Sequence, residues 1–241
     1  MRTPRHVIVL ALTLVALVAA GCSGEDSTEQ GGDDTAAIQA RLQAAHQAIT
    51  DAKGLIISLK TTELPSGVTG LLSASGRGYQ GATRDDAAFT GDVTVVTGGG
   101  SLTAEVVAVA GKVYAKTSLT PVFLAIDPAT LKAPDPASLL GAKGDGLPII
   151  LTKTDDVAEK GKSRDGKTVL TTVTGTIPGA VIQDFLPTAD AEGTFKVTYR
   201  LTDDDILTDA NITGPFYADG SDVTYAIVLD PTDDATEITK P

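Results

Sequence analysis

The stretch that decides the fold is Ala88-Phe89-Thr90-Gly91-Asp92-Val93-Thr94-Val95-Val96-Thr97, which is followed by Gly98-Gly99-Gly100 and by residues 101–109. Val93 and Val95 fall on one face of an extended chain, and this period of two predicts a β-strand. The three glycines predict a hairpin turn, so residues 101–109 return antiparallel beside residues 88–97. A phosphate-binding loop is disfavoured because neither a helix start nor a Lys-Ser/Thr pair follows the glycines.

Similar patterns extend this sheet in both directions. The turn Ala110-Gly111 leads into a strand over residues 112–116, and strands over residues 55–60 and 68–80 precede the quoted stretch. Short turns between neighbouring strands predict an antiparallel meander. Strands are also predicted over residues 155–162, 167–175, 193–201, 206–213 and 223–229.

Helices are predicted where apolar residues recur at spacings of three and four. Residues 35–53 carry one such face, which consists of Ile38, Leu42, Ala45, Ile49 and Ala52. Asp127-Pro128 and Asp135-Pro136 predict two short helical turns, because Asp is a good N-cap and proline suits the first helical position. Residues 147–154 and 178–186 predict two further helices. Together these elements predict an α+β domain with helices on one face of an antiparallel sheet.

The N-terminus predicts secretion and lipidation. Arg2 and Arg5 precede an apolar segment, residues 7–20, that is shorter than the ~20 residues of a membrane span. Ala20-Gly21 directly before Cys22 is typical of a lipobox, in which the cysteine is lipidated and the chain is cut before it. We therefore predict a signal peptide at 1–21, lipidated Cys22 with a flexible acidic tether at 22–34, and one α+β domain at 35–241.

Composition narrows the range of partners and compartments. Without residues 1–21 the chain has 17 Lys and Arg against 31 Asp and Glu, a formal charge of −14. This charge disfavours nucleic acid as a partner. Cys22 is the only cysteine, so neither a disulfide nor a thiolate metal site is expected within the mature chain.

Catalytic and metal sites are not expected. His46 is the one histidine of the mature chain, and we predict that it is a solvated helix residue and not a base of a Ser-His-Asp triad. Asp203-Asp204-Asp205 could bind calcium, but a hairpin tip is favoured because the spaced ligands and loop glycine of calcium sites are missing. No metal, cofactor or enzymatic activity is therefore predicted.

The ordered series of segments resembles one family, the LppX/LprA/LprF/LprG lipoproteins of actinobacteria. The similar segments are Thr90-Gly91-Asp92-Val93, residues 104–116 with the core Ala-Gly-Lys-Val-Tyr-Ala, the two Asp-Pro turns, residues 158–175, the helix from Pro178, and the ending Ile238-Thr239-Lys240-Pro241. The lipobox and the acidic tether also fit. The resemblance covers nearly all of the mature chain.

The resemblance implies a curved antiparallel β half-barrel packed over several helices and enclosing a hydrophobic cavity. It also implies a non-enzymatic carrier of acylated lipids or glycolipids, anchored through diacylglyceryl-Cys22 on the outer face of the cytoplasmic membrane or found in the outer cell wall. Some members of the family work beside a membrane exporter, so an exporter is a candidate partner. Which lipid is carried is left open.

Candidate lining residues come from one face of the predicted strands: Val93, Val95, Val106, Ala108, Val169, Leu201 and Ile227. Which face points inward is left open, because a shift of one residue exchanges the two sets. The alternative is a structural or signalling lipoprotein whose core is filled and whose surface binds a protein partner. A cavity of several hundred cubic ångströms would favour the carrier, and its absence would favour the alternative.

Overall fold

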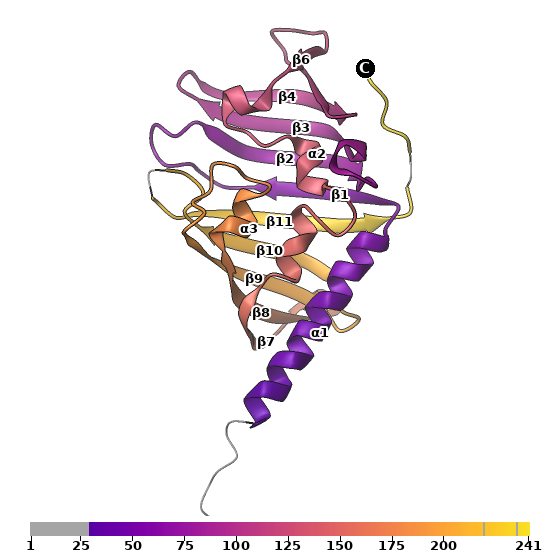
Figure 1. Cartoon of the computed structure of the whole chain (residues 1–241), viewed down its shortest axis with the longest axis vertical. Coiled ribbons are helices and arrows are strands. Elements are labelled where there is room, and N and C mark those ends of the chain that lie inside the picture. The colour runs from indigo at the N-terminus through magenta and orange to yellow at the C-terminus, as the bar shows by residue number, and fades with distance from the viewer. Residues whose placement is uncertain (1–28, 219, 235) are drawn as a thin grey trace, which may run out of the picture.

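Eleven antiparallel strands form one curved, open sheet in the order β6-β5-β4-β3-β2-β1-β11-β10-β9-β8-β7 (Figure 1). The structure, a computed structural model, describes residues 29–218, 220–234 and 236–241. The strands are β1 (Gly54–Lys60), β2 (Gly70–Tyr79), β3 (Ala88–Thr97), β4 (Gly100–Val109), β5 (Lys112–Lys116), β6 (Leu124–Ile126), β7 (Asp155–Asp165), β8 (Thr168–Pro178), β9 (Thr194–Thr202), β10 (Leu207–Gly214) and β11 (Val223–Thr232). The antiparallel sheet predicted from the strand pattern, and the half-barrel implied by the family resemblance, are confirmed.

Two meanders meet at β1. Leu59 is paired with Ala74 of β2 on one side and with Ile227 of β11 on the other. The meander from β2 to β5 was predicted from short turns, whereas the β1–β11 pair joins segments from opposite ends of the chain. Local sequence pattern contains no information about such a long-range pair.

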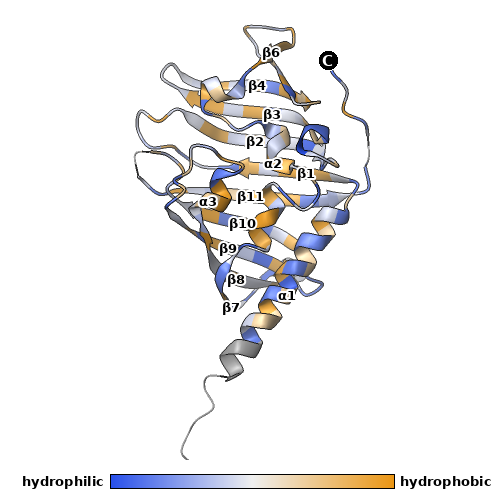
Figure 2. Ribbon diagram, viewed as in Figure 1, coloured by the Kyte–Doolittle hydropathy of each residue, from blue (hydrophilic) through white to orange (hydrophobic). Residues whose placement is uncertain are grey.

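The helices lie on one face of the sheet (Figure 1). They are α1 (Glu29–Asp51), η1 (Arg84–Asp86), η2 (Pro128–Leu131), α2 (Pro136–Leu140), η3 (Leu147–Leu151) and α3 (Gly179–Gln183), where η marks 3₁₀ turns. The predicted apolar face of α1 is confirmed, because Ile38, Leu42, Ala45 and Ile49 are all buried. Figure 2 shows hydrophobic and hydrophilic residues interspersed along α1 and along the strands.

Several boundaries differ from the prediction. Helix α1 begins at Glu29, so residues 29–34 belong to it and not to the expected tether. The predicted helices at 147–154 and 178–186 are shorter than expected, and β6 was not predicted because three residues are too few to show a period.

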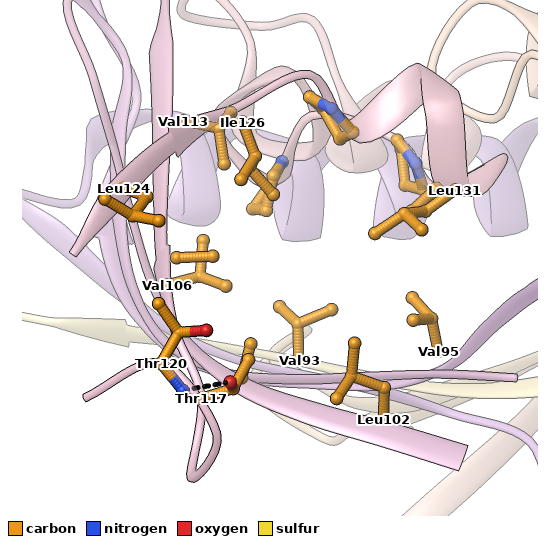
Figure 3. A pocket seen from close by; sticks show the side chains of 16 residues that line it. Val93, Val95, Leu102, Val106, Val113, Thr117, Thr120, Leu124, Ile126 and Leu131 are labelled. Atoms are coloured by element: carbon orange, nitrogen blue, oxygen red, sulfur yellow. Dashed lines mark hydrogen bonds between the residues drawn. The ribbon is translucent and has the colours of Figure 1, made fainter. Parts of the chain in front are cut away.

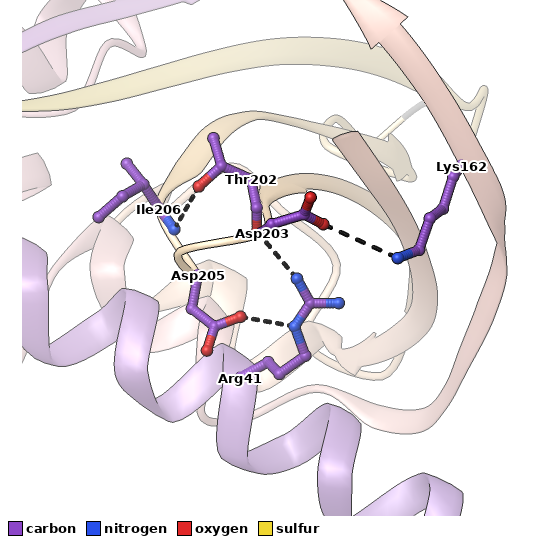
Figure 4. A network of polar contacts seen from close by, with 6 residues as sticks. All are labelled: Arg41, Lys162, Thr202, Asp203, Asp205 and Ile206. Carbon is purple, nitrogen blue, oxygen red and sulfur yellow. Dashed lines mark hydrogen bonds and ion pairs between the residues drawn. The ribbon is translucent and has the colours of Figure 1, made fainter. Parts of the chain in front are cut away.

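An ion pair fixes α1 to the β9–β10 turn (Figure 4). The Nε of Arg41 donates to Asp205 Oδ1 at 2.5 Å, and Nη2 donates to the carbonyl of Thr202 at 2.9 Å. Both charged side chains are mostly buried, at 23% and 32% exposed. Asp203-Asp204-Asp205 is therefore a hairpin tip, as favoured from the sequence, and one of its carboxylates positions the helix.

Aromatic residues fill the part of the interior under β9 to β11. Phe216 packs edge-on against both Phe195 and Tyr225, with ring centroids 4.8 Å apart in each pair. The hydroxyl of Tyr225 donates to the carbonyl of Leu71 and lies 2.7 Å from the hydroxyl of Tyr217. These large rings leave little free space in this half of the molecule.

The predicted signal peptide, Cys22 and the tether up to residue 28 lie outside the described residues. Among the residues that the structure describes, no helix is long and apolar enough to cross a membrane.

Candidate functional site

An apolar pocket lies between strands β3 to β6 and the segment that follows β6 (Figure 3). Its volume is about 170 Å³. Fourteen of its sixteen lining residues are apolar. The two others lie in the β5–β6 connection, where the backbone N–H of Thr120 donates to the hydroxyl of Thr117 at 3.1 Å. The lining consists of Val93, Val95, Leu102, Ala104, Val106, Val113, Ala115, Thr117, Thr120, Leu124, Ile126, Pro128, Leu131, Ala133, Pro134 and Pro136.

The strand register explains why these side chains converge. Val93 is paired with Ala104, and Val95 is paired with Leu102, so the lining residues of β3 and β4 stand side by side. Val113 is paired with Ile126, and Ala115 with Leu124, which continues the set onto β5 and β6. Because side chains alternate between the two faces of a sheet, the lining residues follow every second position over part of β3 and β4 and along β5 and β6.

The opposite face of the same strands is polar beside the pocket and becomes apolar toward Val107 and Tyr114. Thr94 and Thr103 are hydrogen-bonded at 2.9 Å, and Lys116 forms an ion pair with Glu105 at 2.5 Å. A slip of one residue would turn these threonines and charges into the pocket, which disfavours a shifted register.

A cover segment, residues 127–136, closes the pocket on the helix side. Asp127 accepts a hydrogen bond from the backbone N–H of Ala129 at 3.0 Å, and Asp135 accepts one from that of Ala137 at 2.9 Å. Both predicted Asp-Pro helical turns are thereby confirmed. The prolines of these turns present rings without N–H donors to the pocket, which keeps its lining apolar.

A second hollow of about 540 Å³ lies on the other side of the cover segment. It shares five lining residues with the apolar pocket: Val113, Ile126, Pro128, Ala133 and Pro134. Its wall also carries charged groups, which are those of Arg84, Lys112, Asp127, Asp135 and Asp184. Burial raises the pKa of the Asp135 carboxyl above its usual range, against the opposing effect of its hydrogen bond from Ala137.

The seven predicted lining residues fall into three groups. Val93, Val95 and Val106 line the pocket. Ala108, Leu201 and Ile227 point to the same side of the sheet but are fully buried in the packed core. Val169 on β8 is half-buried and lies outside that core.

The remaining lining residues were missed by the sequence reasoning. Leu102, Ala104, Val113 and Ala115 continue the alternation of Val93 and Val106, so extending the period along each strand would have found them. The residues of β6 and of the cover segment carried no such signal, apart from the high density of proline between Pro121 and Pro136.

Polar groups in the interior serve the fold. The Tyr199 hydroxyl lies 2.7 Å from Thr154 Oγ1 and donates to the carbonyl of Ile150 at 3.0 Å. His46 lies on α1 as predicted, but it is half-buried and not fully solvated, and its Nε2 lies 3.2 Å from the carbonyl of Gly144. The described residues contain no group of three or more His, Cys, Asp or Glu side chains that could hold a metal ion.

Comparison with known proteins supports both the fold and the family expected from the sequence. A family model described as LppX_LprAFG lipoprotein matches residues 34–239. The crystal structure of LprF from Mycobacterium bovis is similar with a TM-score of 0.67 and 17% identity, covering 86% of this chain and 97% of that chain. For the Mycobacterium tuberculosis lipoprotein LppX the TM-score is 0.56 and the identity 13%, with 85% and 99% covered. No curated protein matches the chain.

Proposed function

Because the chain belongs to the LppX_LprAFG lipoprotein family, we propose that it binds the acyl chains of a lipid or glycolipid in the pocket between β3–β6 and the cover segment. In this proposal the protein carries its lipid between membranes of the cell envelope. The observation that supports it best is the pocket itself, with fourteen apolar residues among the sixteen that line it.

Solvation gives the proposal its physical basis. An acyl chain of ~16 carbons exposed to water costs on the order of 13 kcal/mol, at ~0.8 kcal/mol for each methylene. A pocket that replaces bilayer contact by apolar protein contact removes part of this cost, and no catalytic group is required. We therefore propose a non-enzymatic role.

The volume of the pocket sets a limit on what it holds. An apolar cavity of about 150 Å³ is known to accommodate one benzene ring, so about 170 Å³ accommodates roughly six carbons of an acyl chain. This is below the several hundred cubic ångströms expected for a lipid carrier. A longer chain would extend beyond this pocket, and the neighbouring hollow, which shares five of its lining residues, is the adjoining space.

The neighbouring hollow offers a place for a polar headgroup. Arg84 and Lys112 supply cations, and the carboxylates of Asp127, Asp135 and Asp184 accept hydrogen bonds from hydroxyl groups such as those of a sugar. A glycolipid requires such a division, with its acyl chains in the apolar pocket and its sugar in the polar hollow beside it.

The anchor completes the proposal. Diacylglyceryl-Cys22 would hold the domain on the outer face of the cytoplasmic membrane, and a membrane exporter would be a suitable partner for handing over the lipid. Cys22 lies outside the described residues. The lipobox pattern supports the anchor, and the family supports the exporter.

Lipid extraction tests the proposed cargo. We would produce the full chain in an actinobacterial host, purify it under non-denaturing conditions, and analyse bound lipid by native mass spectrometry. The expected result is a folded protein that carries non-covalently bound acylated lipid in addition to its anchor, and a matched Val93→Trp variant that carries less. A folded protein without any non-covalently bound acylated lipid would contradict the proposal.

One observation favours a second candidate function. Because the pocket is small, a structural or signalling lipoprotein that binds a protein partner is also consistent with the fold. In that case the full chain would carry no lipid and would instead retain a specific envelope protein through its surface.

A further inference from the structure

Exposed hydrophobic residues gather in one short segment at the lip of the pocket. Leu119 is 86% exposed, Val122 59%, Leu124 51% and Ile126 37%. These four are the majority of the large exposed hydrophobic residues in the part of the chain that the structure describes. We define residues 117–126 as the tip segment. Clustered apolar exposure of this kind marks a site of association with a protein or a membrane.

The tip segment is continuous with the pocket. Leu124 and Ile126 belong to the exposed patch and also line the pocket, facing Val106 across it (Figure 3). Phe123 packs on the opposite side of the sheet, against the small cluster that contains Tyr114 and Val107, so the segment wraps around the sheet edge. A surface that covers this lip would therefore be in direct contact with the entrance to the apolar lining.

The chemistry of the segment suits a bilayer. Residues 117–126, Thr-Ser-Leu-Thr-Pro-Val-Phe-Leu-Ala-Ile, contain no charged side chain, although the whole chain has a net charge of −12 and 21% charged residues. Entry of this segment into hydrocarbon would bury apolar area without burying a charge, which is the costly step in membrane insertion.

The position of the tip segment decides which bilayer it faces. β6 lies at one end of the long axis of the molecule, and the start of α1 lies at the other end (Figure 1). The predicted anchor at Cys22 precedes α1 in the sequence. The chain therefore enters the domain at the end that lies away from the tip segment.

We propose that the tip segment docks onto a lipid bilayer other than the one that holds the anchor, and so brings the lip of the pocket against that second membrane. The proposal rests on the proposed function for its purpose and for the anchor at Cys22. Docking itself does not require that the pocket hold a lipid, so the two can fail separately.

A single tryptophan makes the docking measurable, because the chain contains none. The lipidated full chain carrying Leu119→Trp is placed in donor vesicles of phosphatidylcholine, and protein-free acceptor vesicles carry brominated acyl chains that quench tryptophan. Expected are a blue shift and quenching when acceptors are added, reversed when they are removed. The matched variant Ile56→Trp places the probe on a 51% exposed apolar residue of β1 and should not respond.

The strength of docking is tested by placing negative charges on the tip segment and measuring the clustering of vesicles. The double variant Leu119→Asp with Val122→Asp should weaken the clustering of donor and acceptor vesicles at least ~10-fold, since even one lost aliphatic contact with hydrocarbon has about that effect. The control pair Ile56→Asp with Val228→Asp changes two exposed residues outside the tip segment and should leave clustering unchanged.

Three results would overturn the proposal. The first is the absence of tryptophan quenching by brominated lipid in the acceptor vesicles, whether or not brominated lipid in the donor vesicles quenches. The second is equal quenching of Leu119→Trp and Ile56→Trp, because such a signal would not depend on the tip segment. The third is clustering that requires the protein on both vesicle populations, which would show self-association. If the folded protein docks but carries no acylated lipid, the docking stands and the lipid cargo fails.

Discussion

Replacing Val93 by tryptophan tests whether the pocket is the binding site. The side chain of Val93 points into the pocket from β3, beside Val95 and opposite the cover segment (Figure 3). It is only partly buried against the core, so a larger side chain has free space to enter. The indole ring should therefore occupy the pocket without displacing packed neighbours.

The size of the effect follows from the volume. An indole is larger than the benzene ring that fills a cavity of about 150 Å³, so it takes up most of the 170 Å³ available. About six methylenes of an acyl chain are then excluded, and at ~0.8 kcal/mol each they account for about 5 kcal/mol of binding free energy. This corresponds to a Kd weaker by about three orders of magnitude.

The assay is titration of the purified full chain with a fluorescent fatty-acyl probe. The matched control is Val228→Trp, the same substitution at an exposed valine of β11, which should bind the probe like the unmodified protein. A thermal unfolding curve for each variant confirms that both are folded. The tryptophan of Val93→Trp, the only one in that variant, should also emit at short wavelength because its surroundings are apolar.

An unchanged Kd for a folded Val93→Trp would refute the reasoning. Loss of probe binding in Val228→Trp as well would refute it too, because the effect would then not depend on the pocket.

Three further predictions concern stability, each measured as the free energy of unfolding in urea. Arg41→Ala should lower it by about 1–3 kcal/mol, because the substitution removes charge-assisted hydrogen bonds that hold α1 to Asp205 and the β9–β10 turn. Gly91→Ala should lower it by about 1–3 kcal/mol or more, because a Cβ there would lie 2.1 Å from a carbonyl oxygen of β2, whereas Gly98→Ala, with open space around it, should stay within about 0.5 kcal/mol. Asp135→Asn keeps the helix cap and removes a carboxyl whose pKa is raised by burial, so its stability relative to the unmodified protein should rise with pH.

The sign for Asp135 follows from proton binding. A folded-state pKa above the ordinary 3.8 means that the folded chain binds more protons than the unfolded chain in the window above that value. The contribution of this carboxyl to stability therefore falls as pH rises through the window. A difference between Asp135→Asn and the unmodified protein that does not change with pH would contradict this.

The other two predictions have equally direct contrary outcomes. Arg41→Ala would contradict the role of the ion pair if its stability equalled that of the unmodified protein. Equal stabilities of Gly91→Ala and Gly98→Ala would show that the close approach of β2 and β3 at Gly76 and Gly91 is not required.

Local periodicity predicted the elements that line the pocket. The alternation along residues 88–116 identified the strands, and with them Val93, Val95 and Val106 on one face. The N-cap chemistry of Asp127 and Asp135 predicted the turns of the cover segment in the same way. In both cases the pattern and its cause are local: the alternation of side chains along a strand and the N-cap hydrogen bond each involve residues only a few positions apart.

What periodicity could not predict is where the interior is open. Leu201 and Ile227 also alternate and also point inward, but Phe195, Phe216 and Tyr225 fill the space around β9 to β11. The sixteen residues around the pocket include no aromatic ring, so a hollow remains under β3 to β6. Which half of a curved sheet receives the large rings depends on the β1–β11 pairing and on the loop that carries Phe216, both of them long-range features.

The most direct test of the central claim is to locate a bound acyl chain by photo-crosslinking. A lipid with a diazirine on its acyl chain is bound to the full chain, irradiated, and the modified peptides are identified by mass spectrometry. Our account predicts crosslinks within residues 93–106 and 113–136, lost in Val93→Trp. Crosslinks confined to α1 or to the polar outer face of the sheet, or the absence of crosslinks from a folded protein, would contradict it.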